Sequence, residues 1–115
     1  AVVKELIRTE ADGGISFGDY ELAAKAKNMI LSTEEIDKVK TFKEITKLER
    51  NGLFVYESVP GSAVENFKLT DTEVAFQISA PEDVQFTLEL EPESEYEVLL
   101  DGVSAGKMTT NLSGS

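Results

Sequence analysis

Alternation of apolar and polar positions is clearest in the last third of the chain, where apolar residues fall at every second position. They form two series: Val84, Phe86, Leu88 and Leu90, then Tyr96, Val98 and Leu100. A period of two is typical of a β-strand with one buried face. Asp101-Gly102 follows the second series and supplies residues that tolerate the positive φ of a tight hairpin turn. We therefore predict a core built from β-sheet.

Turn-forming residues divide most of the remaining chain into short strand-like runs. Ala11 to Gly14 predicts a hairpin between residues 2–8 and 15–17, and Asp71-Thr72 precedes an alternating run at 74–78. Residues 41–50 fit a helix or a strand; the following Asn51-Gly52 turn favours a strand, because a hairpin needs two arms. Pro60-Gly61-Ser62 is expected to end a strand, and Phe67 to anchor a loop to the core.

A different period appears between residues 19 and 40. Apolar residues recur there with helical spacing at Leu22, Ala23, Ala26, Met29 and Ile30. Asp19 is a candidate N-cap, and Ser32 with Glu35 forms a capping-box pattern. The whole pattern predicts a mainly β protein: an antiparallel β-sandwich, or a partly open barrel, of about seven or eight short strands. One or two short helices are expected between residues 19 and 40.

The composition of the chain excludes several classes of function. The chain has 115 residues, which suits a single domain, and a formal net charge of −11 with neither His nor Cys. The charge disfavours nucleic-acid and anionic membrane partners, and no apolar run approaches the length of a membrane span. The missing residue types exclude Ser-His-Asp and Cys-His catalysis and ordinary zinc sites. We expect no catalytic residues, metal or cofactor. The start at Ala1 lacks a signal-peptide pattern, which favours a cytoplasmic protein.

Two groups of side chains are candidates for binding. The acidic residues between Glu89 and Asp101 could supply a carboxylate pair, but they are better explained as the solvated face and loop of an antiparallel strand pair. A calcium site has little support, because the EF-hand pattern is absent and the nearest spacing offers only Asp71 and Glu73. Most aromatic residues are expected in the core. If Leu53 and Val55 faced inward, Phe54 and Tyr56 would be exposed and could stack on a sugar ring.

Two resemblances carry further expectations. The order Tyr96-x-Val98-x-x-Asp101-Gly102, followed by Gly106, Thr109 and Gly114, resembles the last hairpin of immunoglobulin-like or fibronectin-like β-sandwich modules of bacterial polysaccharide-degrading enzymes. In those modules a closing strand follows, so the resemblance implies that residues 1–115 form a sandwich lacking its last strand. Most of the chain, except about residues 28–37, is also similar to a family of small uncharacterised proteins of Clostridium-like Firmicutes. These proteins often carry an automatic endosialidase label, but no catalytic motif is available to transfer.

The sequence therefore favours a non-catalytic β-sandwich that acts in self-assembly or protein interaction through an unpaired sheet edge. The partner would be a second copy or another strand, and the expected edge residues are Val3, Leu6, Met108 and Thr110. The alternative is a carbohydrate-binding accessory module that uses Phe54 and Tyr56. An enzyme that uses carboxylates alone is the third interpretation.

Overall fold

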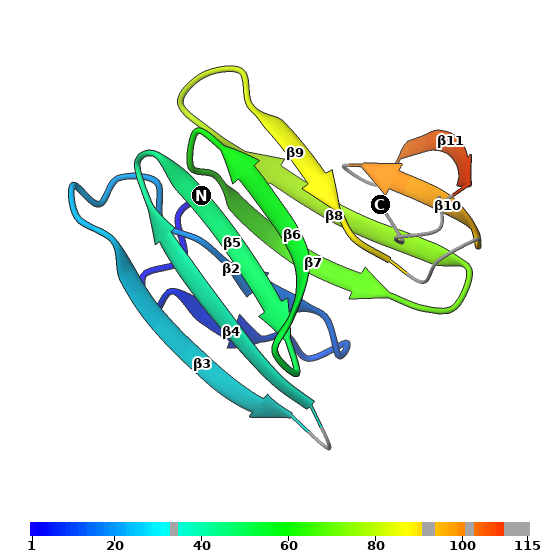
Figure 1. Cartoon of the computed structure of the whole chain (residues 1–115), viewed down its shortest axis with the longest axis horizontal. Coiled ribbons are helices and arrows are strands. Elements are labelled where there is room, and N and C mark those ends of the chain that lie inside the picture. The colour runs from blue at the N-terminus through cyan, green and yellow to red at the C-terminus, as the bar shows by residue number, and fades with distance from the viewer. Residues whose placement is uncertain (33–34, 91–93, 101–102, 110–115) are drawn as a thin grey trace.

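The computed structural model describes residues 1–32, 35–90, 94–100 and 103–109. Every regular element in these residues is a β-strand. The strands form two sheets that face each other, as Figure 1 shows, with β3 to β6 and β9 in the front layer and β7 and β8 behind them. The predicted mainly β sandwich is therefore confirmed, although the described residues contain eleven strands instead of seven or eight.

The six-stranded sheet has the order β1-β2-β7-β8-β10-β11. Its strands are β1 (Ile7–Thr9), β2 (Ile15–Phe17), β7 (Ala63–Leu69), β8 (Glu73–Ser79), β10 (Glu95–Leu100) and β11 (Val103–Thr109). Neighbouring strands pair antiparallel except β8 and β10, which pair in parallel. The first and last of the described strands, β1 and β11, therefore lie at opposite edges of this sheet.

The five-stranded sheet has the order β3-β4-β5-β6-β9 and is antiparallel throughout. Its strands are β3 (Ala26–Ser32), β4 (Glu35–Phe42), β5 (Ile45–Arg50), β6 (Leu53–Val59) and β9 (Gln85–Leu88). β5 and β6 form the hairpin predicted from Asn51-Gly52. Asn51 has φ of 52° and Gly52 of 81°, and two consecutive positive values are what a tight hairpin turn requires.

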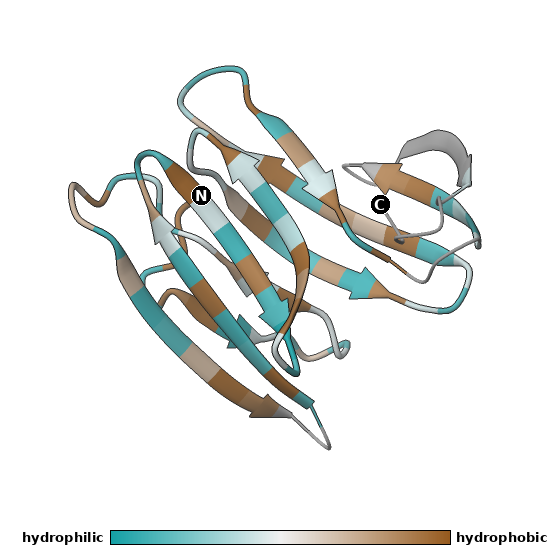
Figure 2. Cartoon of the chain, viewed as in Figure 1, coloured by the Kyte–Doolittle hydropathy of each residue, from teal (hydrophilic) through white to brown (hydrophobic). Residues whose placement is uncertain are grey.

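The core lies between the sheets, where brown bands alternate with teal ones along the strands in Figure 2. Its centre is a group of aromatic rings: Phe17, Tyr56, Phe67, Phe76 and Phe86. Tyr56 touches four of them, with ring centroids 5.4 Å from Phe17 and 5.9 Å from Phe76. Edge-to-face contacts of this kind add to the free energy gained by burying the rings.

The helix predicted between residues 19 and 40 is wrong, because β3 and β4 form a hairpin there. Ser32 and Glu35 do not cap a helix but lie directly opposite each other across that hairpin. The carboxylate of Asp19 accepts a hydrogen bond from the N–H of Glu21. This bond closes a turn and does not cap a helix. The apolar residues with helical spacing do not share one buried face: Ala23 and Met29 are exposed, whereas Ile30 packs against the core.

Two β-bulges change the predicted inward positions. Opposite Leu48 and Glu49, β6 has an extra residue, so that Val55 and Tyr56 are both buried in succession. Between Glu65 and Lys68, Asn66 has φ of 55°, which brings Phe67 back to the core. Phe67 is buried as predicted but lies in a strand and not in a loop.

The stretch from Val84 to Leu100 divides between the sheets. β9 pairs with β6, while β10 pairs with β8 and β11, so the two alternating series do not pair with each other. Asp101-Gly102 lies outside the described residues, but the strands that flank it pair antiparallel, with Leu100 opposite Val103.

Candidate interaction surface

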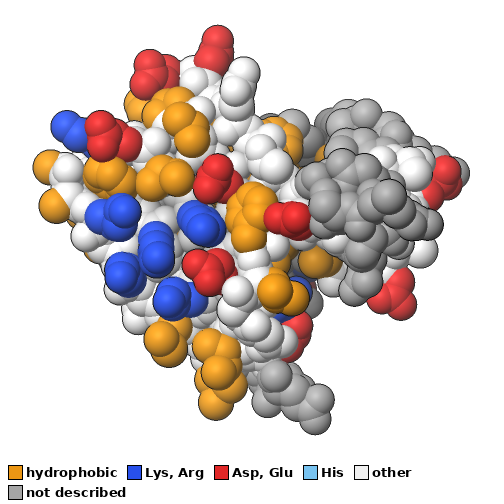
Figure 3. All heavy atoms as spheres, in the orientation of Figure 1, with side chains coloured by type: hydrophobic (Ala, Val, Ile, Leu, Met, Phe, Trp, Pro, Cys, Tyr) orange, Lys and Arg blue, Asp and Glu red, His pale blue; other side chains and the backbone are white. Residues whose placement is uncertain are grey.

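The outer side of the five-stranded sheet is basic although the chain is strongly acidic. Four lysines occupy its outward positions, and Lys25, just before β3, lies over the ring of Phe42. These five residues are called here the lysine face: Lys25, Lys27, Lys38, Lys40 and Lys47. Figure 3 shows them as one blue cluster over β3, β4 and β5, with few acidic side chains between them. A chain with a net charge of −11 thus concentrates nearly half of its 11 cationic side chains on one sheet face.

Three of these lysines stand in one row across neighbouring strands. Lys40 of β4 is directly opposite Lys27 of β3 on one side and Lys47 of β5 on the other. Like charges in directly opposite positions destabilise a sheet. Glu57 of β6 lies opposite Lys47 and offsets its charge, but Lys27 and Lys40 lie opposite each other. Folding alone does not favour that pair, which makes the face a candidate for binding. The alternation of Lys38 and Lys40 with Val39 is visible in the sequence, but only the strand order brings Lys27 and Lys47 beside them.

The predicted aromatic site is not assembled. Tyr56 is fully buried at the centre of the core, so the bulge in β6 removes it from any ligand. Phe54 is half-buried on the outer side of the sheet, where the Nζ atom of Lys47 lies 5.8 Å from its ring centroid. Lys25 lies at the same distance from the ring of Phe42. Both rings hold lysines of the lysine face by cation–π contacts.

Three exposed apolar side chains adjoin the lysine face at one end. Met29 and Leu31 project from β3, and Ile36 from β4 directly opposite Leu31; their exposed fractions are 58%, 75% and 49%. We call these three residues the β3–β4 patch. Large apolar side chains that cluster on a surface mark contact sites far more often than single ones do. The sequence placed Met29 in a helix and singled out neither Leu31 nor Ile36.

β3 is an edge strand of the five-stranded sheet, and the side chain of Asn28 hydrogen-bonds to the backbone along this edge. The side-chain oxygen of Asn28 accepts the N–H of Met29 at 2.9 Å, and its Nδ2 atom donates to the carbonyl of Glu5 at 2.9 Å. The edge N–H of Met29 is thereby satisfied within the chain. Such a device works against the addition of a further strand at this point.

The edge residues predicted from the sequence are placed differently. Val3 is fully buried, donates its N–H to Gly18 and accepts the N–H of Leu6, so it cannot form a contact surface. Leu6 is half-buried and packs against the core. Met108 belongs to β11, the edge strand of the six-stranded sheet, opposite Tyr96, and Thr110 lies outside the described residues. β1 and β11 are the edge strands of the six-stranded sheet, but Val3 and Leu6 precede β1.

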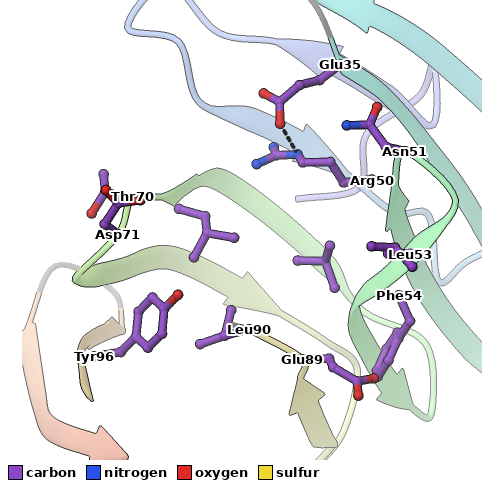
Figure 4. A pocket seen from close by; sticks show the side chains of 12 residues that line it. Glu35, Arg50, Asn51, Leu53, Phe54, Thr70, Asp71, Glu89, Leu90 and Tyr96 are labelled. Carbon is purple, nitrogen blue, oxygen red and sulfur yellow. Dashed lines mark ion pairs between the residues drawn. The ribbon is translucent and has the colours of Figure 1, made fainter. Parts of the chain in front are cut away.

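A cavity of about 650 Å³ opens between the sheets at one end of the sandwich. Figure 4 shows Arg50 and Leu53 on one side of it and Leu90 and Tyr96 on the other. The Nε atom of Arg50 donates to Asp37 at 2.8 Å and lies 3.4 Å from Glu35. Because these carboxylates already neutralise Arg50, the cavity offers little attraction to an anionic ligand.

Two carboxylates of the described residues, Glu10 and Asp12, have lowered pKa values. Hydrogen bonds from Ser16 and Arg8 hold the pKa of Glu10 below its usual range, and Lys68 with the N–H of Gly14 does the same for Asp12. Within the acidic run, Glu89 borders the cavity, and Glu95 and Glu97 lie on β10; Glu91, Glu93 and Asp101 are outside the described residues.

The described residues contain no cluster of three or more Asp or Glu side chains arranged to hold a metal ion. They also contain no helix with the length and apolar character that crossing a bilayer requires.

Comparison with known proteins gives no match. No family model matches the chain, and no curated protein or solved structure matches it either. Both resemblances drawn from the sequence therefore stay predictions.

Proposed function

We propose that this chain is a non-catalytic β-sandwich interaction protein that associates with a second copy of itself through the β3–β4 patch, beside the edge of the five-stranded sheet. The observation that carries the proposal is the exposure of Met29, Leu31 and Ile36 as one group. The remaining exposed large apolar residues of the described chain, Leu53 and Val59, lie at opposite ends of β6.

The size of the patch sets the strength of the contact. Complete burial of a Leu, Ile or Met side chain contributes about 1.5–3 kcal/mol. Since the three side chains are between half and three-quarters exposed, covering them contributes about 4 kcal/mol. Association itself costs at least about 4 kcal/mol in lost freedom of movement. The patch alone therefore gives a weak complex, and a stable one needs favourable contacts from the adjoining lysines.

The contact is made by side chains and not by added strand hydrogen bonds. Asn28 already satisfies the N–H of Met29, and it ties β3 to Glu5. The outward side chains of Met29 and Leu31, in contrast, remain exposed beside these hydrogen bonds of Asn28. The carbohydrate-binding alternative has less support, because Tyr56 is buried and the one remaining ring, Phe54, already holds Lys47.

Replacing Leu31 with Asp tests the proposal, and Leu53 offers a matched control. Both are leucines near a strand end, with exposed fractions of 75% and 73%. Light scattering coupled to size-exclusion chromatography, over a wide range of protein concentration, should show oligomers for the wild type and for Leu53→Asp. Leu31→Asp should be monomeric with an unchanged thermal unfolding temperature. A wild-type protein that stays monomeric at the highest concentration would refute the proposal.

A further inference from the structure

The residues around the β3–β4 patch follow a definite order along the strands. In the direction of β3, a first level holds Lys27 and Lys40, a second Met29 and Lys38, and a third Leu31 and Ile36. We call these six residues the β3–β4 strip. It runs from cationic to apolar in steps of two residues, so a partner that fits it should run from acidic to apolar with the same step.

The outer side of the six-stranded sheet carries such a sequence on β10. Tyr96 and Val98 are buried with exposed fractions of 1% and 5%, so the alternate residues Glu95, Glu97 and Leu99 face outward. We call these three residues the β10 row. In the register of the sheet, Glu97 lies opposite Glu73 of β8 and Lys107 of β11.

The geometry points to a specific pairing: we propose that the β10 row of one copy packs on the β3–β4 strip of a second copy. This inference rests on the self-association proposed above and names the surface that covers the patch. From Lys27 to Leu31 and from Glu95 to Leu99 the strands each advance four residues, or about 13 Å. Glu95 and Glu97 then meet the lysines, while Leu99 meets Leu31 and Ile36.

The two surfaces lie on different sheets of the same molecule, so the contact is head-to-tail. One copy uses its strip for one neighbour and its row for another, and an interface of this type continues until a ring closes. Oligomer size should therefore increase with protein concentration instead of stopping at a dimer. Because part of the attraction is between charges, added salt should weaken assembly without abolishing the apolar contact.

Mixing two variants tests this arrangement. Leu31→Asp destroys the strip and keeps the row, whereas Leu99→Asp destroys the row and keeps the strip. Each change should raise the dissociation constant at least about 30-fold, as loss of a central contact residue does. Each variant alone should be monomeric. An equimolar mixture should form a 1:1 heterodimer that does not grow, because it contains one intact interface and one with two opposed carboxylates.

Because Leu99 is half-buried, its replacement requires a second row variant, Glu95→Lys with Glu97→Lys, which changes only outward charges. Thermal unfolding identifies a variant that has not folded. If the folded row variants assemble as the wild type does while Leu31→Asp is monomeric, the patch has a different partner surface and the β10 row is refuted. A mixture that remains monomeric refutes the pairing as well. A monomeric wild type would instead refute self-association itself.

Discussion

Tyr56 links the stability of the sandwich to alkaline pH. Its ring is fully buried, and its hydroxyl group lies 2.8 Å from the Oγ atom of Ser62, which in turn lies 2.6 Å from Ser58. Burial raises the pKa of the Tyr56 hydroxyl, while the hydrogen bonds with Ser62 and Ser58 oppose that change. The folded chain thus keeps this proton at a pH where the unfolded chain releases it.

The sign of the effect follows from this difference. In the unfolded chain a tyrosine ionises near pH 10. Between that pH and the higher pKa of folded Tyr56, the unfolded state binds fewer protons, so the free energy of unfolding decreases by up to about 1.4 kcal/mol per pH unit. Below pH 10 the contribution is fully present, and it is lost as the pH rises through the folded pKa.

Tyr56→Phe separates the two effects of the hydroxyl group. At pH 7 the variant should be less stable by about 1 kcal/mol, since it loses one hydrogen bond while Ser62 keeps its contact with Ser58. Above pH 10 it has no proton to release at this position. Urea denaturation at several pH values between 7 and 11 should show that the stability advantage of the wild type shrinks above pH 10. A constant difference over the whole range would refute the role assigned to burial.

Two further predictions concern other buried contacts, and both are measured by urea denaturation. Arg50→Gln should cost about 3 kcal/mol, because it leaves the carboxylate of Asp37, whose exposed fraction is 1%, without its cation; adding Asp37→Asn should recover part of the loss, and no recovery would show that the charge is not the cause. Gly61→Ala should cost about 3 kcal/mol, because a Cβ atom would lie 2.0 Å from the carbonyl oxygen of Phe42. Gly13→Ala, where no atom lies within 4 Å but φ is 90°, should cost only about 1 kcal/mol, and equal losses at both glycines would contradict the role of close packing at Gly61.

Local signals in the sequence predicted the strands whose inward residues are apolar. Val74 and Phe76 in β8 and Tyr96 and Val98 in β10 are buried as their alternation indicates. Such a strand can be predicted from its own sequence, because its inward side chains are all apolar and alternate with polar ones. The Asn51-Gly52 turn is a signal of the same local kind.

β4 was missed because two of its inward residues are polar. Asp37 and Thr41 alternate with Val39 on the buried side. Their partners lie on β5: Arg50 pairs with Asp37, and Thr46 shares a hydrogen bond of 2.8 Å with Thr41. A buried polar side chain needs a hydrogen-bond partner, and here that partner lies on another strand, where the local sequence does not show it. The alternation of β4 was therefore not recognised, and the helical spacing of Met29 and Ile30 led to the prediction of a helix.

The lysine face could not be predicted from the sequence for a related reason. Lys27, Lys40 and Lys47 are far apart in the sequence, and only the pairing of β3, β4 and β5 aligns them. In an isolated molecule this alignment costs free energy, about 0.2–1 kcal/mol for each pair of opposed like charges. Threonine, which is favourable in strands, would avoid that cost at Lys40. Glu57 of β6 lies opposite Lys47 in this row, whereas Lys27 and Lys40 lie opposite each other. In the head-to-tail contact proposed here, the Glu95 side chain of a second copy would cover that pair.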